Sequence, residues 1–295
     1  DPQYSRPDEW NGKHVPEVLT GGNAKEISAW RLNESIKRTK ERRPDLYEKY
    51  IASQEIISRL KKKKRDNYYM IESLNRGKSE VLYCDDYVVL LEDSNHECYY
   101  IWLDDMAVDL QNDAAIEAAL SNVTELLDTN RLLVVQTKKV ADYLCGLLHI
   151  TIAMESHLYT YTQKDYKHIN GYDIRMLGLE YFDEIFQMYD EESECNLRHM
   201  LSTGKVYGIF VENELAGFCG EHLDGCTGPL IIKEKYRKQG LGYVLERYML
   251  NVYKEKDEIM YCYVKTGNMA SEELQSKLGL YSSDKLIYWL GRYEF

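Results

Sequence analysis

The chain has 295 residues, 44% of them hydrophobic, so it can bury more than one core and is not a disordered polypeptide. Its formal net charge of -12 is unevenly distributed: residues 1–65 contain 16 Lys and Arg against 10 Asp and Glu, or +6, which leaves -18 on the remainder. We therefore expect the basic segment and the acidic remainder to have different binding partners.

The spacing of the cysteines, histidines and apolar residues argues against a disulfide-rich, metal-binding or membrane-spanning protein. The seven cysteines include no C-x-x-C pair, which favours reduced thiols in a cytoplasmic setting over a disulfide framework. The seven histidines have no H-x-x-x-H spacing, so we expect no metal site. No apolar run approaches the roughly 18 residues of a membrane span, so we expect no membrane partner. The sequence opens with Asp1 and without a signal peptide, and we expect it to be a piece of a longer polypeptide.

Residues 1–65 are predicted to form a small, basic, all-α module. The first 23 residues are punctuated by proline and glycine and predict an irregular lead-in. Apolar residues then recur at helical spacing as far as Pro44, which should break or restart the helix. A second helix is expected over residues 45–65, ending in a run of lysines and an arginine.

Residues 66–165 alternate between strand and helix patterns. Runs such as "CYYIWL" and "RLLVVQT" have the aromatic and β-branched content of strands, whereas residues 112–129 and 139–150 have amphipathic helical spacing. Their order, β-β-α-β-α-β, predicts a small α/β unit.

Residues 166–295 are predicted to form a second α/β unit. The order is strand, helix, three strands, helix, strand, helix and strand, with hairpins at the "ENE" turn and at Asp224-Gly225. The similar order in both units suggests an internal duplication, although no residue-level repeat accompanies it. The predicted fold class is α/β with a mixed sheet, preceded by the helical module.

A glycine-containing loop follows a predicted strand in "LIIKEKYRKQGLGYVLERYMLNVY", which starts at Leu230. Such a loop places several backbone N–H groups at the positive end of a helix, beside cationic side chains, and favours phosphate or pyrophosphate. A dinucleotide fingerprint is excluded because Leu245 stands where its last glycine should be, and the chain has no G-x-x-x-x-G-K run. The alternative is a glycine-rich turn without a ligand, since the following helix carries its own apolar stripe.

The same loop resembles the acyl-CoA-binding motif of the GNAT N-acyltransferase superfamily. That motif, Arg/Gln-x-x-Gly-x-Gly/Ala entering a helix, matches Arg237, Gly240 and Gly242. A second GNAT motif, an Asn that opens a helix ending in Lys-Leu-Gly, matches "GNMASEELQSKLGL" with Asn268. The resemblance covers residues 172–295 well. More faintly, the first α/β unit resembles the degenerate N-terminal half of tandem-domain bacterial GNAT proteins.

The resemblance implies an acetyltransferase with acetyl-CoA as co-substrate and no metal. The strand before the loop would present free backbone groups to the pantetheine arm, at Leu230, Ile231 and Ile232. The pyrophosphate would rest on the backbone amides of Lys238, Gln239, Gly240, Leu241, Gly242 and Tyr243. An acceptor amine, on a small molecule or a peptide, would attack the thioester directly.

The catalytic groups of the family are only partly matched. Where the family often has a Tyr that protonates the thiolate, this chain has Gln275, and Tyr263 stands where some relatives have a Glu base. The nearest acid–base candidates are Glu221, His222 and Asp224. We expect Asp224 to form the turn, and neighbouring residues 221 and 222 to alternate faces, and we select Glu221 as the candidate base. The alternative is proximity with water-mediated deprotonation.

The first 65 residues have a resemblance of their own. "DPQYSRP", "VPEVLTGGN" and "AWRLNESIKRTKERRPDL" resemble the C-terminal part of bacterial tRNA (guanine-N1)-methyltransferases. In that family this helical domain grips the tRNA anticodon arm, so the resemblance implies tRNA as a partner of the basic module. The family's catalytic aspartate would lie at or before Asp1, and we assign no methyltransferase residue. The alternative for the charge run is a solvated helix face.

Three functions therefore stay open at this point. The expected one is an acyl-CoA-dependent N-acyltransferase. The others are a tRNA-binding module that binds acyl-CoA without turnover, and a bifunctional tRNA-modifying polypeptide. The motifs specify neither the acceptor, nor the acyl length, nor the oligomeric state, because acceptor pockets are built from loops without a motif.

Overall fold

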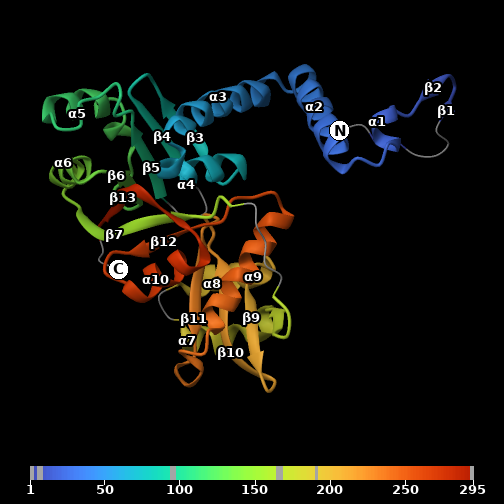
Figure 1. Ribbon diagram of the computed structural model, residues 1–295. Coiled ribbons are helices and arrows are strands. Elements are labelled where there is room, and N and C mark those ends of the chain that lie inside the picture. Colours follow the sequence, from blue (N-terminus) through green and yellow to red (C-terminus); the bar gives the residue numbers. More distant parts are fainter. Residues whose placement is uncertain (1–2, 5–8, 94–97, 164–168, 190–191, 293–295) are drawn as a thin grey trace. The chain divides into compact units, whose positions relative to one another are not determined.

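The computed structural model describes residues 3–4, 9–93, 98–163, 169–189 and 192–292 (Figure 1). The chain divides into two compact units, Asp1–Ser58 and Arg59–Phe295. The predicted boundaries after residues 65 and 165 stay predictions.

The first unit is mainly helical, as predicted. Asn23 caps α2, since its Oδ1 accepts the backbone N–H groups of Lys25 and Glu26 at 3.2 and 3.4 Å. Pro44 starts a new helix. A short hairpin also occurs, which the sequence pattern does not predict because each strand has only two residues. The elements are β1 (Glu9–Trp10), β2 (Lys13–His14), α1 (Glu17–Thr20), α2 (Ala24–Arg42) and α3 (Pro44–Leu60).

The helix predicted over residues 45–65 is wrong in its bounds. α3 ends at Leu60, and after a short 3-10 turn a separate helix, α4 (Lys64–Asn75), continues well past the basic run. The reason is tertiary burial: Tyr69 and Met70 are 1% and 0% exposed, so the second half of α4 packs into a core.

Seven strands of the second unit form a mixed sheet, which confirms the predicted fold class. Their order is β12-β7-β13-β6-β5-β4-β3, and neighbours are antiparallel except the parallel pair β5 and β6. The strands are β3 (Glu80–Cys84), β4 (Val88–Asp93), β5 (Cys98–Leu103), β6 (Leu132–Gln136), β7 (Thr151–Thr160), β12 (Tyr261–Lys265) and β13 (Tyr281–Gly291).

The last strand, β13, lies between β6 and β7 in this sheet. Strands from both predicted α/β units therefore share one hydrogen-bonded layer. α5 (Asp113–Leu120), which is shorter than the predicted 112–129, and α6 (Lys138–Leu148) pack against it through a core that includes Leu120, Leu133 and Leu144.

A second, four-stranded sheet has the order β11-β10-β9-β8 and is antiparallel throughout. Both predicted hairpins are present: β9 and β10 are joined by Glu212 and Asn213, each with positive φ, and β10 pairs with β11. The strands are β8 (Asp173–Met176), β9 (Tyr207–Val211), β10 (Glu214–Glu221) and β11 (Thr227–Ile232).

Helices cover both faces of the four-stranded sheet (Figure 1). One core joins Cys219 of β10 to α9 (Leu241–Glu255), and the other joins Phe218 to α7 (Phe182–Met188) and α8 (Glu194–Ser202). The sequence pattern does not predict α8, a nine-residue helix capped by Ser193. The remaining helix, α10 (Met269–Leu278), precedes β13.

Candidate functional site

Two strand edges meet at the candidate site. β11 is an outer strand of the four-stranded sheet and β12 is an outer strand of the seven-stranded sheet, and the two lie close together. In the described part of the chain, β11 pairs only with β10 and β12 only with β7, so no ladder of hydrogen bonds joins β11 to β12. The backbone edge of β11 that faces β12 is therefore available to hydrogen-bond an extended ligand. The predicted residues Leu230, Ile231 and Ile232 lie on this strand and are partly buried.

The loop after β11 leads directly into the N-terminus of α9. Lys238 and Gly240 adopt positive φ of 61° and 80°, and α9 begins at Leu241. The N-cap residue, Gly240, has no side chain that could accept hydrogen bonds from the first backbone N–H groups of this 15-residue helix. Residues 237–240 are exposed. The structure thus brings the predicted amides together at the positive end of a long helix, in an arrangement suited to an anion.

Side chains of the loop mainly hold its shape. Arg237 donates from Nε to the carbonyl oxygen of Ile232 at 3.0 Å, and Gln239 donates from Nε2 to that of Lys235 at 3.2 Å. A Cβ at Gly242 would lie 3.4 Å from Leu230 Cδ2, an ordinary van der Waals contact, so the packing of α9 does not itself require this glycine. Backbone amides rather than side chains are therefore the main groups that the loop offers to a ligand.

Asn268 is an exposed helix cap in this structure. Its Oδ1 accepts the backbone N–H of Ser271 at 3.2 Å at the start of α10. A local structural role thus accounts for the asparagine of the second motif, and its binding of acyl-CoA stays a prediction.

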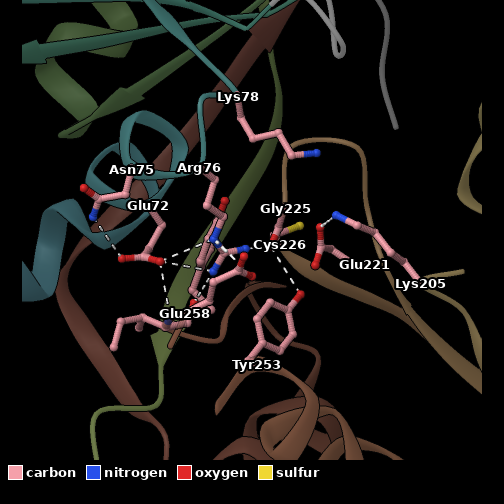
Figure 2. Close-up of polar contacts among 12 residues, drawn as sticks. Glu72, Asn75, Arg76, Lys78, Lys205, Glu221, Gly225, Cys226, Tyr253 and Glu258 are labelled. Atoms are coloured by element: carbon pink, nitrogen blue, oxygen red, sulfur yellow. Dashed lines mark hydrogen bonds and ion pairs between the residues drawn. The ribbon is translucent and has the colours of Figure 1, made fainter. Parts of the chain in front are cut away.

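Arg76, at the end of α4, contacts the chain where β11 and β12 begin (Figure 2). No sequence motif indicates this residue. Its guanidinium donates to the carbonyl oxygen of Gly225, just before β11, at 2.8 Å, and to that of Ile259, just before β12. It pairs with Glu72 at 3.2 Å and lies over the ring of Tyr253. A single buried cation, its side chain 6% exposed, thus links the starts of both strands.

Glu221, the candidate base, is a buried partner of Lys205 (Figure 2). Its side chain is 3% exposed and its Oε1 accepts a hydrogen bond from Lys205 Nζ. Asp224 forms the turn, as expected, because its Oδ1 accepts the N–H of Cys226 at 2.9 Å. His222 instead pairs with Glu192, at 3.6 Å. The structure therefore places Glu221 in an ion pair, and a catalytic role for it stays a prediction.

Gln275, which occupies the position of the family tyrosine, is also buried. It is 2% exposed, and its Nε2 donates to both carboxylate oxygens of Glu246 on α9, at 3.0 and 2.9 Å. Burial raises the pKa of Glu246 to about 7. Gln275 therefore links α10 to α9 inside the core.

Comparison with known proteins separates the chain into two parts. Residues 1–49 match the family model of the tRNA (Guanine-1)-methyltransferase TrmD, and residues 206–290 match the model described as FR47-like protein. The tRNA (guanine-N(1)-)-methyltransferase of Chlamydia pneumoniae is 58% identical over 55 residues, 19% of this chain and 15% of that protein. That of Macrococcus caseolyticus is 51% identical over 65 residues, 22% of this chain and 27% of that protein. The chain thus spans between a seventh and about a quarter of the length of these relatives.

Solved structures resemble the chain in fold. A Drosophila protein solved by a structural genomics consortium has a TM-score of 0.55 and 14% identity, over 90% of this chain and 96% of that one. A GCN5-related N-acetyltransferase from Kribbella flavida has a TM-score of 0.51 and 13% identity, over 77% of this chain and 96% of that one. Among the residues that the structure describes, no helix is long and apolar enough to cross a membrane. The chain therefore joins a start similar to the tRNA (guanine-N1)-methyltransferases to a region with the GNAT fold.

Proposed function

We propose that residues 59–295 transfer an acyl group from acyl-CoA, with acetyl-CoA as the donor to test first, to an amine acceptor. The observation that carries this proposal is the unpaired edge of β11 running into the uncapped N-terminus of α9. An extended arm that ends in a pyrophosphate matches both features, because the strand edge offers hydrogen bonds to amides and the helix end favours negative charge.

The parts would then act in sequence along β11. Amides of Lys238 to Tyr243 hold the pyrophosphate, and backbone groups of Leu230 to Ile232 hold the pantetheine arm. The acceptor amine attacks the thioester carbonyl, and the CoA thiolate leaves. A thiol pKa of roughly 8.5 makes a thiolate a feasible leaving group near neutral pH without an acid at the position of Gln275.

Binding can be tested with a matched pair of glycine variants. Gly240 and Gly77 both have positive φ, 80° and 63°, and a Cβ on either would meet nothing within 4 Å. Gly240→Asp introduces a carboxylate at the proposed pyrophosphate site, whereas Gly77→Asp places the same strain and charge after α4. We expect Gly240→Asp to weaken acetyl-CoA binding by about tenfold or more in calorimetry, roughly 1.4 kcal/mol, and Gly77→Asp to leave it unchanged. Equal affinities would contradict the proposed site.

Turnover needs a second measurement. We expect free thiol to be released from acetyl-CoA in the presence of at least one of a panel of primary amines: an amino acid, a polyamine and a lysine-containing peptide. Binding of acetyl-CoA without thiol release from any of them would favour the non-catalytic alternative, in which the fold only binds acyl-CoA.

A second activity, tRNA binding by the first unit, is favoured by its similarity to the tRNA (guanine-N1)-methyltransferases. Cations along α2, among them the exposed Arg42 and the half-buried Arg38, could contact phosphates. We expect a gel-shift series to show tRNA binding that weakens steeply as salt rises. Arg38→Glu with Arg42→Glu should weaken it further, whereas Lys138→Glu with Lys139→Glu, on α6, should not. Absence of binding at low salt would reject this activity.

A further inference from the structure

His222 lies in a rigid turn between β10 and β11. Its backbone N–H donates to the carbonyl oxygen of Cys226 at 2.9 Å, and its own carbonyl oxygen accepts the N–H of Gly225 at 2.9 Å. Asp224 fixes the same turn through its bond to the N–H of Cys226. These backbone hydrogen bonds on both sides of His222 fix the main chain from which the imidazole projects.

One nitrogen of the imidazole faces a carboxylate. His222 Nδ1 lies 3.6 Å from Glu192 Oε2, and the two side chains are 22% and 17% exposed. Glu192 is itself held by Asn196, whose Nδ2 donates to Oε1 at 2.9 Å. Burial acts to raise the pKa of Glu192, but the neighbouring His222 and the hydrogen bond from Asn196 bring it below its usual value. A carboxylate at this place favours the tautomer with the proton on Nδ1, which leaves Nε2 as a proton acceptor.

The other nitrogen faces β11. A Cβ on Gly228 would lie only 2.7 Å from His222 Nε2, and Gly228 has φ of 149°. Glycine is therefore needed both for the backbone conformation and for the approach of the ring. Gly228 precedes Pro229 and Leu230, where the proposed pantetheine contacts begin.

The direction of β11 relates this nitrogen to the proposed reaction. A strand rises roughly 3.3 Å per residue, so Gly228 lies about 13 Å along the strand from Ile232. If the pyrophosphate binds beyond Ile232, the pantetheine arm runs back along the strand and carries the thioester toward Gly228. His222 Nε2 then borders the reacting end of acyl-CoA.

The charged groups nearby are already engaged. Glu221, one residue before, pairs with Lys205. Lys78 donates from Nζ to the carbonyl oxygen of Leu223 at 2.7 Å, and Asp224 accepts within the turn. Among these neighbours, His222 combines an orienting carboxylate with a nitrogen directed at β11.

We propose that His222 is the general base of the acyl transfer and that Glu192 is a positioning residue for it, which rests on the acyltransferase function proposed above. The acceptor nitrogen attacks the thioester carbonyl carbon, a C–N bond forms, and the C–S bond breaks as CoA leaves as a thiolate. The proton of the acceptor nitrogen passes to His222 Nε2. It then leaves to the thiolate or to water, which returns the imidazole to its neutral form.

Steady-state thiol release with acetyl-CoA and the best amine of the panel tests this assignment. We expect His222→Gln to lower kcat by roughly 10²- to 10⁴-fold with unchanged calorimetric affinity for acetyl-CoA, which also shows that the variant is folded. His222→Ala should regain part of its activity when imidazole is added to the assay. Glu192→Gln should lower kcat by about tenfold and leave KM for acetyl-CoA unchanged. His199→Gln, an exposed histidine on α8, is the matched control and should behave as the parent.

The outcomes separate the two proposals. A parent protein that releases no thiol with any amine overturns the acyltransferase function, and the base assignment with it. An active parent with a His222→Gln variant within about twofold of it overturns the base assignment alone. Loss of activity that imidazole does not restore in His222→Ala, with acetyl-CoA binding intact, contradicts the proton-transfer role.

Discussion

The buried carboxyl of Glu246 predicts how the stability of the second unit depends on pH. The residue is 4% exposed on α9, and in the described part of the chain no cation forms a salt bridge with it. Its partner Gln275 donates to it from Nε2, while Gln275 Oε1 is buried without a hydrogen-bond partner among the described residues. Glu246→Gln replaces the carboxyl with a neutral group of the same shape whose amide can donate to that oxygen.

The sign of the effect follows from the raised pKa. Burial raises the pKa of Glu246 from 4.5 to about 7. Below about pH 4.5 the carboxyl is neutral in both states and the folded protein loses nothing. As pH rises from there through about 7, the unfolded chain ionises first, so the free energy of unfolding falls. At roughly 1.4 kcal/mol per pKa unit, the total loss is about 2–4 kcal/mol. Glu246→Gln should remove this loss.

Urea unfolding of the full chain, followed by far-ultraviolet circular dichroism between pH 5 and 8, measures how the free energy of unfolding depends on pH. We expect Glu246→Gln to exceed the parent in free energy of unfolding at pH 8 by about 2–4 kcal/mol, with the difference shrinking toward pH 5. Glu273→Gln, an exposed partner of Lys277 on α10, is the control and should show the pH dependence of the parent. The reasoning fails if Glu246→Gln keeps the parental fall in stability, or is the less stable protein at pH 8.

Two further predictions concern the strands of the candidate site. Arg76→Met should lower the free energy of unfolding by about 3–5 kcal/mol, because it leaves Glu72 and two carbonyl groups without their buried cation, whereas Arg175→Met, on an exposed pair, should change it little in the same urea titration. Gly228→Ala should lower kcat for thiol release by about tenfold or more, because a Cβ would displace the His222 ring. If Gly228→Ala has the same kcat as the parent in the thiol-release assay, catalysis does not depend on the position of the His222 ring beside β11.

Local pattern alone determined much of the secondary structure and the loop. The run "CYYIWL" coincides with β5, and Pro44 starts a helix, because both signals lie within the segment itself. The glycine at position 240 adopts the positive φ that a strand-to-helix turn of this kind needs. The resemblance to GNAT proteins was found from the spacing of residues within two local motifs, the glycine loop and the helix that Asn268 opens.

Only the tertiary structure decided which side chains meet. The alternation of a strand indicates that Glu221 and His222 face opposite ways, but not that Lys205 neutralises one and Glu192 orients the other. Arg76 contacts a carbonyl group 149 residues further along the chain, a distance over which no periodicity carries information. These pairings depend on how the sheets pack and on where β13 inserts, and packing is a property of the whole chain.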